Sequence, residues 1–88
     1  MALFTFLLEF DGGTYISQFR AASPQRAASQ YPSHLMRNNG VPTLAVRKRL
    51  ADAFTGDYPV AMEGMRSVWC CSATIGKKLA LLNIVATA

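Results

Sequence analysis

The start of the chain constrains the fold most, because apolar side chains alternate there with a period of two over Ala2 to Phe10. Such alternation is typical of a β-strand with one buried face. Asp11-Gly12-Gly13 follows and favours a tight turn. Thr14 to Arg20 then returns as a second strand. We therefore predict that the chain begins with a β-hairpin, whose first strand turns four large side chains to one face: Phe4, Phe6, Leu8 and Phe10.

The register of this hairpin depends on which residues form the turn. With Gly12-Gly13 as the turn, Phe10 faces Tyr15, and with Asp11-Gly12 as the turn, Leu8 faces Tyr15. In either register Tyr15, Ser17 and Phe19 join the Phe-rich face. We expect that face to form the core.

The middle of the chain predicts two helices. Ser23-Pro24 suits the start of the first, because Ser caps free amides and Pro fits the first turn. Pro32 is expected to kink or end this helix near Tyr31, since proline removes a backbone hydrogen bond. Thr43 is predicted to cap a second helix over Leu44 to about Phe54.

Two segments around the second helix are irregular. Asn38-Asn39-Gly40 and Pro42 predict a loop between the helices. Gly56 is expected to end the second helix. Residues 55–64 have no periodicity that assigns a structure, and Pro59 and Gly64 favour a loop with a short extended piece.

The last third predicts a second hairpin, with arms Met65 to Ile75 and Lys78 to Ala86 around a turn at Gly76-Lys77. Pairing across that turn places Trp69 near Ile84 and Cys71 near Leu82. Both faces of this hairpin are apolar, and strands of that kind are covered on both sides.

This order predicts one domain over residues 1–88, of the α+β class. Its sheet would have four antiparallel strands, in the sequence strand-strand-helix-helix-strand-strand, with the helices on one face. A chain of 88 residues buries a limited core, yet 51% of its residues are apolar and only 16% are charged. The excess of apolar residues over what the core can hold predicts that some of them are buried against a partner. We expect a homodimer formed by sheet-face packing or edge pairing. The interface residues expected on the face away from the helices are Leu3, Leu7, Ile16, Leu79, Leu81 and Val85.

The net charge of +4 is unevenly distributed. Residues 12–51 hold six Lys or Arg and no acidic residue. Nucleic-acid binding through the basic segment from Arg20 to Arg49 is therefore the alternative function, although neighbouring residues on a helix cannot all face one ligand. The residues expected to contact nucleic acid are Arg37, Arg47, Lys48 and Arg49.

No motif of catalysis, metal binding or cofactor binding is visible. Cys70 and Cys71 are adjacent, which is closer than a disulfide usually allows, and no second pair suggests zinc. His34 has no predicted partner, and we expect it at the surface beside the kink. We therefore expect no enzyme, no cofactor and no metal. The sequence assigns no reactivity to either thiol and identifies no ligand or partner.

No targeting signal is evident either. The apolar start has no preceding Lys or Arg, and the apolar run from Leu79 to Ala88 has about half the length that spans a bilayer. We expect a cytoplasmic protein without a membrane segment.

Asp11-Gly12-Gly13, Tyr15, Ser23-Pro24 and Ala27-Ala28 give residues 4–30 a resemblance to the hairpin-helix unit of the HicB-like antitoxin domains. The resemblance implies a non-catalytic protein that dimerises and binds a basic toxin. The family's helix is usually long and acidic, whereas this one holds Pro32 and Arg residues. Composition and resemblance together favour a small interaction module that binds itself and a protein partner.

Overall fold

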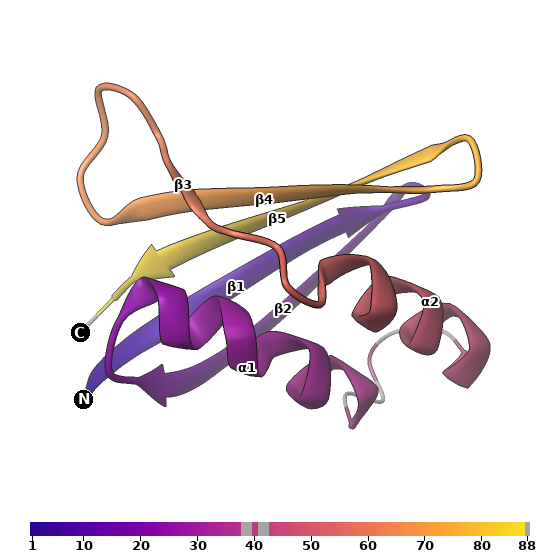
Figure 1. Cartoon of the computed structure of the whole chain (residues 1–88), viewed down its shortest axis with the longest axis horizontal. Helices are drawn as coiled ribbons and strands as arrows, with labels where there is room; N and C mark the ends of the chain where they lie inside the picture. Colours follow the sequence, from indigo (N-terminus) through magenta and orange to yellow (C-terminus); the bar gives the residue numbers. More distant parts are fainter. Residues whose placement is uncertain (38–39, 41–42, 88) are drawn as a thin grey trace.

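The computed structural model describes residues 1–37, 40 and 43–87. In this part of the chain, one antiparallel sheet carries both helices on the same face (Figure 1). The sheet order is β2-β1-β5-β4-β3. The elements are β1 Ala2–Phe10, β2 Gly13–Ala21, α1 Pro24–Met36, α2 Leu44–Phe54, β3 Val60–Ala61, β4 Val68–Ile75 and β5 Lys78–Ala86. The predicted α+β class is confirmed, but the predicted number of four strands is wrong, because the sheet has five.

The first hairpin adopts the second of the two registers. Leu8 lies opposite Tyr15 and Phe4 opposite Phe19. The turn residues Asp11 and Gly12 both have positive φ angles, 51° and 81°. A two-residue turn of that kind matches the right-handed twist of the strands.

The second hairpin pairs as predicted, with Trp69 opposite Ile84 and Cys71 opposite Leu82. Its first arm begins at Val68, three residues later than the expected Met65. The additional strand, β3, lies in the segment left unassigned and pairs with β4. A strand of two residues is too short to show alternation, so its sequence carries no signal.

Helix α1 begins as expected, since the Ser23 Oγ accepts a hydrogen bond from the Arg26 amide at 3.1 Å. The expected break near Tyr31 is wrong, because α1 continues through Pro32 to Met36. Tyr31 and Leu35 are both fully buried against the sheet. Their packing on both sides of Pro32 offsets the hydrogen bond that proline cannot make.

Helix α2 has the predicted bounds, and the Thr43 Oγ1 accepts a hydrogen bond from the Val46 amide at 3.1 Å. Gly56 follows its end with a φ of 79°. The predicted loop at Asn38-Asn39-Gly40 and Pro42 lies outside the described residues except for Gly40.

The core lies between the helices and the Phe-rich face of the sheet. The Phe6 ring lies 4.3 Å from the Phe19 ring and 5.0 Å from the Tyr31 ring, between centroids. The Phe54 ring of α2 meets Tyr31 edge-on at 6.2 Å. Helix α1 packs over β2 and β5, and α2 packs over β4. The opposite face of the sheet carries no helix (Figure 1).

Candidate functional site

The helix-free side of the sheet, here called the open face, holds all six residues predicted for an interface. The register places them there, because their neighbours Phe4, Phe6, Leu8, Leu82 and Ile84 point into the core. Ile16 and Leu79 are 62% and 58% exposed. Leu3, Leu7, Leu81 and Val85 are half-buried.

These side chains form a continuous patch across three strands. Leu7 of β1 lies opposite Ile16 of β2 on one side and Asn83 of β5 on the other. Leu81 of β5 lies opposite Glu9, toward the turn end of the hairpins. Val85 lies opposite Thr5, toward the chain termini. The open face therefore mixes aliphatic with polar side chains, among them Asn83 and Gln18, whose Nε2 donates a hydrogen bond to the Thr5 Oγ1 at 2.9 Å.

The strands carry only two charged side chains on the open face, counted over the described residues. Glu9 lies opposite Thr14 at the turn end of β1. Arg20 lies opposite Leu3 at the other end of β2, about 20 Å away along the strands. The open face therefore has a negative end, an uncharged centre of aliphatic and polar side chains, and a positive end.

A group of exposed apolar residues beside the open face was not predicted. Tyr58, Val60, Met62 and Met65 are 75%, 66%, 39% and 61% exposed. Val60 lies opposite Cys70 on the open face. The β3–β4 connection extends beyond the sheet on the side away from both helices (Figure 1). The sequence shows that residues 58–65 include several apolar side chains. Without a strand assigned to this segment, their position beside the open face could not be predicted.

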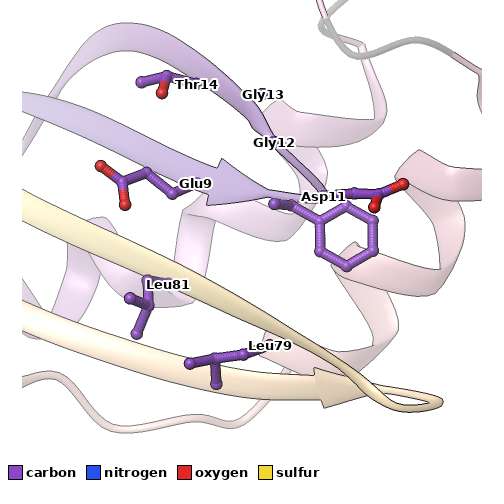
Figure 2. Close-up of a pocket in the computed structure, with 8 residues that line it drawn as sticks. Glu9, Asp11, Gly12, Gly13, Thr14, Leu79 and Leu81 are labelled. Atoms are coloured by element: carbon purple, nitrogen blue, oxygen red, sulfur yellow. The ribbon is translucent and has the colours of Figure 1, made fainter.

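A hollow of about 390 Å³ lies at the turn end of the first hairpin, where Glu9, Asp11 and Leu79 line it (Figure 2). The two carboxylates point in opposite directions (Figure 2). The Asp11 carboxylate accepts an ion-paired hydrogen bond from Lys78 Nζ at 2.9 Å. Over the described residues, His, Cys, Asp and Glu form no group of three that could hold a metal. This hollow therefore lacks the convergent acid and base that hydrolytic chemistry uses.

The structure divides the basic residues that were predicted to contact nucleic acid. Arg37, Lys48 and Arg49 are exposed. Arg47 is half-buried, and its Nη1 donates to the Met36 carbonyl oxygen at 3.3 Å. Arg47 therefore links the two helices and is less available to a ligand than its neighbours.

A second hollow, of about 380 Å³, lies between strand β2 and the outer flank of helix α1; we call it the α1–β2 groove. Phe19 and Arg20 line it from β2, Gln30 and His34 line it from α1, and Arg37 lines it from the C-cap position just after α1. The His34 ring meets the Phe19 ring edge-on, with 4.8 Å between centroids. His34 is thus half-buried, with its ring against Phe19 and lining the groove at the surface.

The groove is electrostatically positive. Arg20 and Arg37 supply this charge, whereas burial, and then the charge of Arg37, lowers the pKa of His34 below its usual value and favours its neutral form. Two arginines line the groove and no acidic residue does. It therefore fits an anionic ligand better than a cation.

The two cysteines lie on opposite faces of β4 and are both free thiols. Cys71 is buried in the core, and burial is the main cause that raises its pKa to about 11. Cys70 is half-buried on the open face. The nearby carboxylate of Asp57 also raises the pKa of the Cys71 thiol, whereas a nucleophilic cysteine requires a lowered one.

A comparison with protein-family models, with curated proteins and with solved structures found no match. Within residues 1–37, 40 and 43–87, neither helix is long and apolar enough to cross a membrane.

Proposed function

We propose that the protein is a small non-catalytic interaction module that forms a homodimer through the open face of its sheet. One observation carries the proposal: the six aliphatic side chains Leu3, Leu7, Ile16, Leu79, Leu81 and Val85 share the face that no helix covers. Packing this face against an identical one would remove them from water on both protomers.

The size of the open face supports a second copy as its occupant. Four strands of eight or nine residues cover roughly 550 Å² in projection, and the corrugated surface area is larger. Stable protein interfaces bury about 800 Å² on each partner. The open face is therefore of the size that a modest dimer uses.

The charges at its two ends also favour a second copy. Two sheets stack face to face with their strands nearly aligned. A two-fold axis across the strands brings each Glu9 near the partner's Arg20, whereas an axis along the strands leaves like charges together. The open face is thus complementary to itself in one orientation.

Light scattering after gel filtration tests the dimer directly. The wild-type chain is expected to elute at twice its mass of 9.6 kDa at micromolar concentration. Leu81→Asp and Leu7→Asp are expected to weaken the dimer at least about tenfold, because a charge on a buried apolar face costs more than about 1.4 kcal/mol. A wild-type monomer at these concentrations would refute the proposal.

Leu44→Asp is the matched control, since Leu44 is 59% exposed but lies at the start of α2. It should leave the dimer intact. Glu9→Arg and Arg20→Glu should each weaken the dimer, and the double variant should restore it if the two-fold axis runs across the strands.

The resemblance of residues 4–30 to HicB-like antitoxin domains stays a prediction, as does nucleic-acid binding through Arg20 to Arg49. The position of Arg47 between the helices reduces the basic surface available for that second function.

A further inference from the structure

The outer edge of the sheet at β2 offers unpaired backbone groups. Strand β2 is the last strand on its side, and it runs for nine residues. The Leu3 carbonyl oxygen accepts a hydrogen bond from the Thr87 amide at 2.8 Å, so Leu3 directs its backbone groups toward β5. Arg20, opposite Leu3, must then direct its own backbone groups outward. The direction of the backbone groups alternates along a strand, so Thr14, Ile16 and Gln18 also direct theirs outward.

This edge also has few of the features that protect sheet edges. Strand β2 holds no proline and no lysine, and its only charged residue is Arg20. An edge strand of this length is a template for the addition of another strand. The α1–β2 groove lies beside the C-terminal end of this edge, at Phe19 and Arg20, so an added strand would contact the flank of α1 there as well as β2.

The charges of the groove determine which side chains are favourable in a strand added to β2. His34 lies on the flank of α1 and Arg37 at its C-cap, and the whole helix holds no acidic residue. A second copy of β2 would bring its own Arg20 and its own α1, and the two positive flanks would repel each other. A strand with acidic side chains on the helix side is attracted instead.

The open-face side of the β2 edge favours apolar side chains in the added strand. Ile16 is 62% exposed and lies on the open face at the edge of the sheet. Side chains alternate between faces in an added strand. A segment that alternates acidic and apolar residues would therefore place its acids near His34 and Arg37 and its apolar side chains near Ile16.

We propose that the α1–β2 groove binds an extended acidic segment of a partner protein, which adds to β2 as a further strand. This mode of recognition takes its affinity from main-chain hydrogen bonds and its selectivity from alternate side chains. It uses the edge of the sheet, and it shares Ile16 and Arg20 with the open face proposed for the homodimer.

A fluorescein-labelled heptapeptide of alternating Glu and Val is the probe, with fluorescence anisotropy as the readout and an alternating Lys and Val peptide as the comparison. The acidic peptide is expected to bind at least about tenfold more tightly than the basic one, as charge complementarity requires. It should also shift the amide signals of Ile16 and Gln18 in NMR spectra and raise the pKa of His34, the only histidine.

Two substitutions test the geometry of the groove. Gln18→Pro removes an outward amide, which an edge strand tolerates, and is expected to weaken binding at least about tenfold. Ser72→Pro is its matched control, because Ser72 lies on β4 beyond the two residues paired with β3. Arg37→Glu should weaken binding by a similar factor, while Arg66→Glu in the exposed β3–β4 connection should not.

Several results would overturn this assignment: no preference for the acidic peptide, equal binding by Gln18→Pro, or displacement of the peptide by single-stranded oligothymidylate that binds more tightly. Conversion of a wild-type dimer to a monomer by Gln18→Pro, but not by Gln18→Ala, would show that a second copy occupies the edge, because both variants remove the open-face side chain and only the first removes the outward amide. Circular dichroism confirms that each variant is folded. Light scattering on the same variants reports the homodimer separately, so failure of the groove leaves the open-face dimer standing.

Discussion

At the scale of single residues, Cys70 and Cys71 show how one step along a strand separates two environments. Strand β4 turns Cys71 into the core and Cys70 to the open face. Burial, with smaller effects of Asp57 and Cys70, raises the pKa of the Cys71 thiol to about 11. The thiol of Cys71 therefore stays protonated in the folded chain at a pH where the unfolded chain has begun to ionise.

This difference predicts that the protein loses stability in alkali. The folded state holds the Cys71 proton more tightly than the unfolded state, so the free energy of unfolding is largest below the ordinary thiol pKa of 9.0 and falls as pH rises toward 11. We expect a decrease of up to about 2 kcal/mol from this group, measured by urea unfolding. Burial also raises the pKa of Tyr31, which acts in the same direction at higher pH.

Cys71→Ala should flatten the decrease just above pH 9, and Cys70→Ala should not. An unchanged slope in Cys71→Ala would contradict the assignment of the effect to the buried thiol.

At the scale of elements, helix α1 illustrates packing that prevails over local preference. Pro32 lies inside the helix, yet α1 continues for four more residues. The buried side chains of Tyr31 and Leu35 hold both halves on the same sheet. The helix therefore exists because of the sheet, and Pro32 destabilises it locally.

Pro32→Ala is expected to raise the free energy of unfolding by about 1 kcal/mol, because it restores a backbone donor and a better helix former. Thermal unfolding followed by circular dichroism measures this change. Pro24→Ala, at the first turn where proline is favoured, should leave stability unchanged or lower it. A less stable Pro32→Ala protein would mean that the proline ring contributes packing that outweighs the lost hydrogen bond.

At the scale of the whole molecule, the two-layer arrangement leaves one large surface of the sheet uncovered. If the open face is the dimer interface, association stabilises the folded state and leaves the unfolded chain unaffected. The melting temperature should then rise with protein concentration. The Leu81→Asp melting temperature should be independent of concentration, and a wild-type value that never changes with concentration would contradict the dimer.

Much of this arrangement follows from local sequence patterns. The alternation around Phe6 and the turn residues Asp11-Gly12-Gly13 predicted the first hairpin in one of two registers, and Gly76-Lys77 predicted the second with its register. Side-chain alternation then places Leu7 and Leu81 on the same face once the two hairpins join in one sheet. The six open-face residues could therefore be named from sequence, because a period of two divides every strand into two faces.

The α1–β2 groove could not be predicted in the same way. Phe19 and His34 are fifteen positions apart, and their contact depends on how α1 crosses the sheet. The position of Arg47 against the Met36 carbonyl likewise depends on the packing of the two helices. Strand β3 was missed because pairing with β4, and not its own two residues, makes it a strand.

The sequence by itself determined the two hairpins, the capped starts of both helices and the division of the strands into an apolar core face and a second, partly apolar face. These features depend on neighbouring residues and on backbone preferences. Only the tertiary structure decided that β2 is an outer strand and that His34 and Arg37 lie beside its unpaired edge. These positions depend on contacts between segments that are distant in the sequence. The free energy of such contacts depends on how whole surfaces fit together, so no periodic pattern in the sequence predicts them.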